Sequence, residues 1–149
     1  MIEIRKVSEN EKEKAVKTAC DVFYLEQDIP KELTVIGDEL SPVWWGAFLK
    51  NELIGTIAAY KENGEQHLGR LTVSQAARGN GLATKLVKTA LNELFDNGAK
   101  EVFLDAREAT KRIILHLGGE VIGTEYRFFN STCVPVRITR EQFLKNAVR

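Results

Sequence analysis

The stretch that decides the fold runs from Leu68 to Val87 and reads LGRLTVSQAARGNGLATKLV. Its first half alternates apolar and polar residues, with Leu71 and Val73 on one side, which is typical of a β-strand. A short loop of small residues follows, and from Leu82 onward apolar residues recur at helical spacing. We therefore expect a strand that turns directly into an amphipathic helix.

Gly79 and Gly81 lie in this turn. Glycine adopts positive φ without strain and leaves nothing to cover the first N–H groups of the helix. Those unpaired donors, together with the helix dipole, attract phosphate groups. A well-capped structural turn without a ligand is the alternative. The segment has neither the Gly-Lys-Ser/Thr ending of a nucleoside triphosphate loop nor the third glycine of a dinucleotide loop. An unrelated domain that binds the phosphates of a nucleotide is a further alternative.

Length and composition predict one soluble domain over residues 1–149. Lysine plus arginine equals aspartate plus glutamate, at 21 each, so no overall charge favours nucleic acid or an anionic membrane. There is no apolar run of membrane-spanning length and no order of residues typical of a signal peptide, so we expect a cytoplasmic location. Cys20 and Cys133 are expected to be reduced, buried thiols because their spacing fits neither a metal site nor a disulfide framework.

The rest of the chain alternates between strand and helix patterns. A short strand and a helix that ends before Pro30 come first, followed by three antiparallel strands with turns at residues 51–52 and 62–65. The helix after Gly81 is expected to end at Asn97 and Gly98. Beyond it we expect a strand parallel to that of Leu71, a helix, two further strands and a last helix, at residues 101–106, 109–117, 121–129, 133–138 and 141–147.

Three aromatic side chains in the antiparallel strands raise separate expectations. Trp44 and Trp45 could stack on a ligand ring, but core packing of at least one ring is the favoured interpretation. His67 is expected at the surface or at a sheet edge rather than in a metal site, because no second ligand lies at a usable spacing.

Two segments resemble those of a known family. Arg78-x-x-Gly81-x-Ala83 resembles the Arg/Gln-x-x-Gly-x-Gly/Ala segment of the GNAT N-acetyltransferase superfamily. The order of expected elements also matches the GNAT arrangement along nearly the whole chain. The ElaA-like branch of these proteins opens in a way that is similar to Val22-Phe23-x-x-Glu26-Gln27, then Pro30, then Gly37-Asp38-Glu39-Leu40.

The resemblance implies a fold and a cofactor site. The fold would be α/β (α+β), with a mixed, mainly antiparallel central sheet flanked by helices and a splayed parallel strand pair at the cofactor cleft. Acetyl-coenzyme A would be the co-substrate, without a metal, its pyrophosphate held by loop amides and its pantetheine arm by the preceding strand. The matching cofactor-binding positions are Leu71, Thr72, Val73, Arg78, Gly79, Asn80, Gly81, Leu82, Ala83 and Thr84.

The resemblance further implies an amine acceptor beside the first helix. Glu26, Asp38 and Glu39 are candidates for binding it, and Glu26 is also a candidate for the general base. The alternative is that Glu26 bonds loop backbone and that the acidic pair stays in water. The acceptor would be an amine of a small molecule, protein or peptide. We expect the chain to be a monomer or homodimer, with no nucleic acid or membrane partner.

The sequence departs from the family at the helix of residues 109–117. Many members have a tyrosine there that protonates the leaving thiolate, and a Leu-Gly-Phe ending, whereas this chain has Ile114 and Leu117-Gly118-Gly119. Isoleucine can donate no proton, so the acid is unassigned between water, Tyr126 and another donor. This departure motivates a second hypothesis, a non-catalytic acyl-coenzyme A binding or sensing module.

Overall fold

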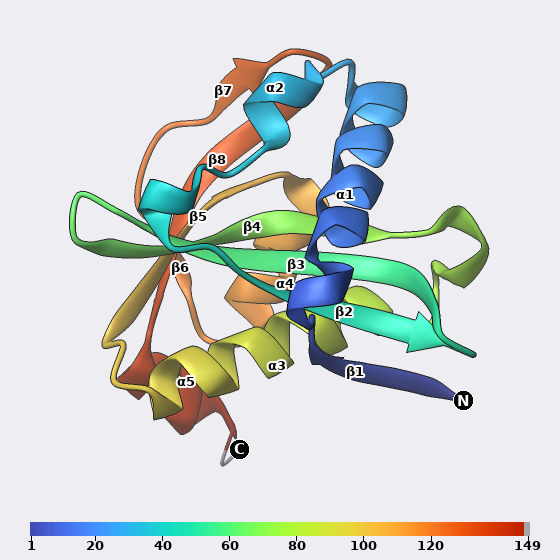
Figure 1. Cartoon of the computed structure of the whole chain (residues 1–149). Helices are drawn as coiled ribbons and strands as arrows, with labels where there is room; N and C mark the ends of the chain where they lie inside the picture. The colour runs from blue at the N-terminus through green and yellow to red at the C-terminus, as the bar shows by residue number, and fades with distance from the viewer. Residues whose placement is uncertain (148–149) are drawn as a thin grey trace.

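A computed structural model describes residues 1–147 of the chain and contains one eight-stranded sheet with helices on both faces (Figure 1). The strand order is β1-β2-β3-β4-β5-β8-β6, and β7 pairs with β8. The strands are β1 (Ile2–Lys6), β2 (Val43–Leu49), β3 (Glu52–Glu62), β4 (Glu65–Val73), β5 (Glu101–Ala106), β6 (Glu120–Val121), β7 (Tyr126–Phe128) and β8 (Ser131–Thr139). The α-helices are α1 (Lys12–Gln27), α2 (Lys31–Thr34), α3 (Leu82–Asp96), α4 (Glu108–His116) and α5 (Arg140–Ala147).

The sheet is antiparallel except where β4 lies beside β5. These two parallel strands pair only at His67 and Phe103, so within residues 1–147 the rest of the facing edge of β4 has no strand partner. The expected mixed sheet with a parallel strand pair is therefore confirmed, and its parallel strands stop pairing before they reach their carboxyl ends.

A β-bulge distorts β4 just beyond its contact with β5. Gly69 lies opposite Ala58 and Thr72 lies opposite Thr56, so two residues of β4 face a single residue of β3. One of those two residues, Arg70, has a φ of 56°. The bulge bends β4 at the point where the two parallel strands separate, which opens space between them.

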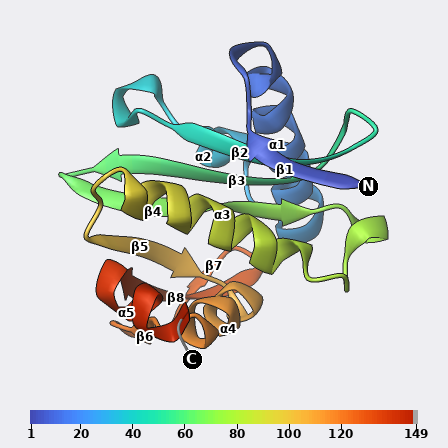
Figure 2. The same ribbon diagram turned by 90° about the horizontal axis from the view of Figure 1, so that it is seen from below.

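The two faces of the sheet are covered by different helices. Trp44 and Trp45 are adjacent on β2 and point to opposite faces, where they are 3% and 1% exposed. Trp44 packs in the core beside α1, and Trp45 packs in the larger core beside α3. In Figure 1, α1 lies in front of the strands, and Figure 2 shows α3 in front of β3 and β4 when the molecule is seen from below. Both tryptophans are thus core residues, as favoured from the sequence.

Local signals in the sequence predicted several element ends, but the strand expected over residues 121–129 is divided into β6 and β7. The turn at Asn63 and Gly64 has positive φ at both residues, as a tight hairpin requires. Thr139 and Gln142 exchange the two hydrogen bonds of a capping box at the start of α5, at 2.9 and 3.0 Å. The turn expected at residues 51–52 lies one residue earlier in the structure. Lys50 and Asn51 adopt positive φ, and Glu52 already pairs with β2.

The expectation for His67 fails because of the tertiary structure. His67 is not at a sheet edge: it lies within the sheet, stacked on Tyr60 with ring centroids 5.3 Å apart.

Cys20 and Cys133 are buried free thiols, as expected. Within residues 1–147, no helix is long and apolar enough to cross a membrane, and no cluster of three or more His, Cys, Asp or Glu side chains could hold a metal ion.

Candidate active site

The turn between β4 and α3 presents its backbone to solvent. Gly79 and Gly81 have φ values of 87° and 73°, as expected for residues that turn a strand into a helix. A Cβ atom added at either glycine would meet no atom within 4 Å, so open space adjoins the turn. Gly81 is the N-cap residue, and α3 begins at Leu82.

The amides of residues 79–84 have no hydrogen-bond acceptor within the described chain. The backbone bonds of α3 begin with the Lys85 amide, which donates to the Gly81 carbonyl at 3.2 Å. No side chain of residues 1–147 caps these N–H groups. Exposed donors at the positive end of a long helix fit a ligand with several anionic oxygens, such as a diphosphate.

Arg78 fastens this turn to α1. Its Nε donates to the Val73 carbonyl at 2.9 Å, and its Nη2 donates to both carboxylate oxygens of Glu26, at 2.7 and 2.8 Å. The structure therefore joins two residues that are 52 positions apart in the sequence and that were both named as site candidates. In this arrangement the Glu26 carboxylate is bound to a cation rather than free to accept a proton from a substrate.

Arg107 makes the equivalent connection after β5. Its guanidinium lies against the side-chain amide of Gln27, whose oxygen, when turned toward it, accepts from Nε at 3.3 Å and from Nη1 at 2.9 Å. Burial lowers the pKa of Arg107. Because Glu26 and Gln27 are neighbours, the last turn of α1 bridges the two chain segments that follow the separated strands β4 and β5.

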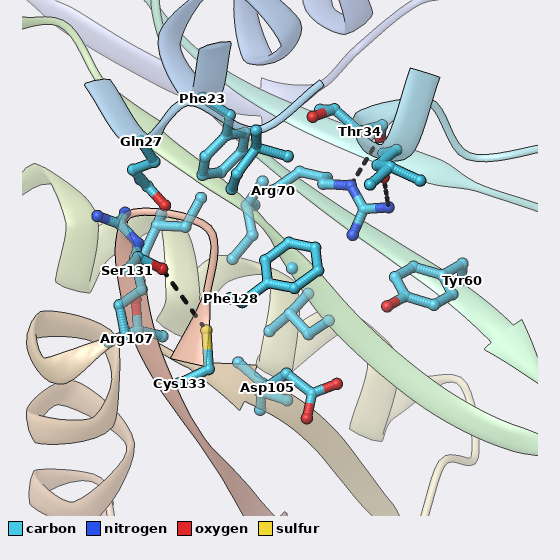
Figure 3. A pocket seen from close by; sticks show the side chains of 18 of the residues that line it. Phe23, Gln27, Thr34, Tyr60, Arg70, Asp105, Arg107, Phe128, Ser131 and Cys133 are labelled. Atoms are coloured by element: carbon cyan, nitrogen blue, oxygen red, sulfur yellow. Dashed lines mark hydrogen bonds between the residues drawn. The ribbon is translucent and has the colours of Figure 1, made fainter. Parts of the chain in front are cut away.

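A cavity of about 290 Å³ lies beside these strands. Its walls come from α1, α2, β3, β4, β5, α4, β7 and β8, and Figure 3 shows side chains from these elements converging on it. The polar side chains that line it include Tyr60, Arg70, Asp105 and Tyr126. A small reactant would fit in this partly open cavity.

Arg70 is held in the cavity wall by main-chain carbonyls. Its Nε donates to the Thr34 oxygen at 2.7 Å, and its Nη2 donates to the Leu33 oxygen at 3.4 Å. Both carbonyls belong to α2, the short helix that sequence reasoning missed. Arg70 makes no ion pair with any carboxylate of residues 1–147, although its guanidinium carbon lies 5.5 Å from the centre of the Tyr60 ring.

The two cavity tyrosines keep their protons at neutral pH. Burial raises the pKa of Tyr60, and the Arg70 charge opposes that effect. Burial, and then the nearby charge of Asp105, raises the pKa of Tyr126. Tyr126 was one of the proton donors considered from the sequence, and the structure places it in the cavity wall.

The other expected site residues fall in different places. Leu71 lines the cavity, whereas Thr72 is buried, with its Oγ1 2.7 Å from Thr56 Oγ1. Asp38 is exposed in a separate surface hollow near Lys12. A Cβ added at Gly37 would clash with Oε1 of Glu39, so the Glu39 side chain folds back over that glycine. Neither acid lines the cavity.

Asp105 is the cavity carboxylate that sequence reasoning missed. It is exposed on β5 between the buried residues Leu104 and Ala106, and it makes no ion pair within residues 1–147. The alternation of buried and exposed residues along β5 was a usable signal, because it places Asp105 on the face opposite α3.

Ile114 and Gly119, where the sequence departs from the family pattern, pack against each other. Ile114 is fully buried in the core that contains Trp45. A Cβ at Gly119 would lie 2.5 Å from Ile114 Cγ2 and 2.8 Å from the Arg137 carbonyl, so the phenylalanine of other members would not fit. The two departures are structurally linked.

The model of the acetyltransferase (GNAT) family matches residues 8–118. The chain belongs to the GNAT acetyltransferase family. No protein with a curated description matches this chain in sequence.

Solved structures with the same fold include close matches in shape. ElaA of Escherichia coli has a TM-score of 0.80 and 21% identity, with 92% of this chain and 99% of that chain covered. An acyl-CoA N-acyltransferase from Pseudomonas aeruginosa has a TM-score of 0.75 and 20% identity, covering 92% and 97%. PaiA N-acetyltransferase of Thermoplasma acidophilum, solved in complex with coenzyme A, has a TM-score of 0.69 and 17% identity, covering 93% and 99%. The resemblance to ElaA-like GNAT proteins is confirmed in fold.

Proposed function

We propose that this GNAT protein is an N-acetyltransferase that transfers an acetyl group from acetyl-coenzyme A to a primary amine by direct attack in a ternary complex. The observation that carries the proposal is the row of unpaired amides at residues 79–84, which follows the end of β4, a strand that stops pairing with β5 after His67. The coenzyme A complex of the PaiA relative supports the same cofactor here.

The chain's own residues divide the work of binding. The amides of residues 79–84 hold the diphosphate, and the open edge of β4 from Leu71 to Val73 bonds the pantetheine arm. Leu71 then directs the thioester into the cavity, where the acceptor amine meets it. Arg78 positions the turn through Val73 and Glu26 rather than acting on the reacting atoms.

Acetyl-coenzyme A would supply an activated acyl group. The neutral amine attacks the carbonyl carbon and a C–N bond forms, the amine nitrogen then loses one proton to solvent, and the C–S bond breaks so that the thiolate leaves with the electron pair. Holding both reactants in one cavity can supply much of the rate acceleration. The Tyr126 phenol, protonated at neutral pH, donates a proton toward the departing sulfur. A thiol leaving group has a pKa near about 8.5, so it needs less acid assistance than an amine would.

A second candidate function is a non-catalytic acyl-coenzyme A binding or sensing module. The fully buried Ile114 favours it, because the helix that carries the family's acidic tyrosine presents no proton donor at that position. The cavity with its two protonated tyrosines favours the enzyme instead.

Two measurements on the wild-type chain separate these functions. Calorimetry with coenzyme A tests the cofactor site, and thiol release from acetyl-coenzyme A is followed over amino acids, polyamines, aminoglycosides and lysine peptides. The enzyme predicts acceptor-dependent thiol release with at least one amine. Binding of coenzyme A without acceptor-dependent release across the whole panel would support the module.

A further inference from the structure

The charges that line the cavity exclude a polycationic acceptor. Asp105 is its one carboxylate among the described residues, whereas two guanidinium groups, Arg70 and Arg107, also line it. A polyamine or aminoglycoside carries several ammonium groups and would place them beside these cations with too few carboxylates to pair them. Like charges in a partly buried site repel strongly, so a ligand that brings its own anion fits better.

Arg70 is prepared to bind that anion. Two α2 carbonyls fix its guanidinium from one side, so binding a ligand would not require the side chain to be ordered first. The guanidinium has no carboxylate partner among residues 1–147, and its planar fork matches a carboxylate. Figure 3 shows Arg70 held toward Thr34 on one side of the cavity, with Asp105 on β5 beyond the ring of Phe128.

Asp105 offers the complementary charge on the neighbouring parallel strand. Arg70 lies three residues beyond His67, and Asp105 lies two residues beyond Phe103, which is the partner of His67. Both side chains therefore follow the last pairing point of β4 and β5 and line the same cavity. The cavity lining also includes the apolar side chains of Ile29, Leu33 and Phe128.

We propose that the acceptor is a free α-amino acid with an apolar side chain, whose carboxylate binds Arg70 and whose amino group lies beside Asp105. This proposal rests on the proposed function, because it names the amine that the transferase would acetylate. The cavity volume of about 290 Å³ is at the lower end of ligand-site volumes, which also favours an acceptor of amino-acid size. When the amino group of the acceptor is protonated, its ammonium pairs with Asp105. The amine reacts after the ammonium has lost a proton to solvent.

The test compares leucine with leucinamide, which has the same side chain and amine but no carboxylate. Calorimetry measures both ligands on the wild-type chain with and without coenzyme A, and spermidine serves as the polycation. The wild type is expected to bind leucine at least tenfold more tightly than leucinamide, and spermidine more weakly than either. Equal or tighter binding of leucinamide or spermidine would overturn the proposal.

Variants then assign the preference to residues. Arg70→Gln should reduce the preference for leucine over leucinamide to less than threefold. Arg70→Lys keeps the positive charge but lacks the planar guanidinium, so it should keep part of the preference. Asp105→Asn should weaken both ligands about tenfold and keep their ratio. Arg127→Gln, an exposed arginine on β7 that does not line the cavity, is the matched control and should behave as wild type. An unchanged ratio in Arg70→Gln with a normal melting temperature would overturn the assignment.

Thiol release with leucine distinguishes the two levels of the proposal. A leucine preference that depends on Arg70, without any thiol release, would support the ligand assignment and refute the transferase. Thiol release with amines that lack a carboxylate, at rates above those for amino acids, would support the transferase and refute the ligand assignment.

Discussion

Two substitutions of Gly81, one by the charged aspartate and one by the neutral asparagine, test the diphosphate site. Gly81 has a φ of 73°, and a Cβ there meets no atom within 4 Å, so Gly81→Asn and Gly81→Asp share the same backbone strain and no steric clash. That strain costs about 1–2 kcal/mol, which lowers the melting temperature by about 3–6 °C in both variants. The two side chains have nearly the same shape and differ in charge.

The difference in coenzyme A affinity between the two variants measures the interaction of the new carboxylate with the diphosphate. Two unit charges about 4 Å apart in water repel by about 1 kcal/mol, so a doubly charged diphosphate adds about 2 kcal/mol, or about thirtyfold in Kd. Isothermal titration calorimetry at low salt measures both constants. The Gly81→Asp variant should bind about thirtyfold more weakly than Gly81→Asn.

Gly64 provides the matched position for this experiment. It also has positive φ, 79°, and open space around its Cβ position, but it lies in the turn between β3 and β4. Gly64→Asp and Gly64→Asn should both bind coenzyme A as the wild type does. If Gly81→Asp binds within threefold of Gly81→Asn, the diphosphate does not lie at this turn and the reasoning is refuted.

Three further outcomes are expected. Tyr126→Phe should lower kcat for acetyl transfer by about tenfold while coenzyme A still binds, and a kcat within twofold of wild type would exclude the phenol as proton donor. Arg5 and the Ser8 cap lower the pKa of Glu11, so Glu11 stabilises the fold above the unfolded pKa of about 4.3 and loses that contribution as pH falls further. The melting temperature of the wild type should therefore exceed that of Glu11→Gln at pH 7, and the difference should decrease toward pH 2. A difference that does not change with pH would contradict the pairing. Leu86→Ala removes a fully buried side chain and should lower the free energy of unfolding by about 2–5 kcal/mol in urea titrations, against about 0.5 kcal/mol or less for the exposed Leu144→Ala; equal losses would show that the core is placed wrongly.

The sequence predicted the features that depend on neighbouring residues. The glycines at 79 and 81 and the helical spacing from Leu82 placed the turn and the start of α3, because positive φ and apolar periodicity are properties of a short segment. The strand, helix, strand order around α3 predicted the parallel pair of β4 and β5, since that order leaves few other connections.

Features that depend on strand register or on distant contacts were not predicted. His67 looked like an edge residue because its sequence context ends a turn, but the register of β4 with β3 and β5 places it inside the sheet. The pairing of Glu26 with Arg78 joins segments far apart in the chain, and no local pattern indicates it. Arg70 faces the cavity only because a bulge in β4 and the short helix α2 hold it there.

The cavity shows the same limit for the acceptor side. Glu26, Asp38 and Glu39 were named because they lie in the segment that forms this side in relatives, and the sequence does not say which acids face inward. Asp105 was passed over because β5 was considered for its apolar residues. The alternation along β5 indicates the face on which Asp105 lies, but its place in one cavity with Arg70 depends on strand pairing that only the folded chain shows.

The most direct measurement of the central claim is a crystal structure of this chain with coenzyme A bound. The account predicts that oxygens of the diphosphate lie within about 3.2 Å of backbone nitrogens among residues 79–84, with the thiol end directed past Leu71 into the cavity. A diphosphate bound elsewhere, with these amides still facing solvent, would contradict it.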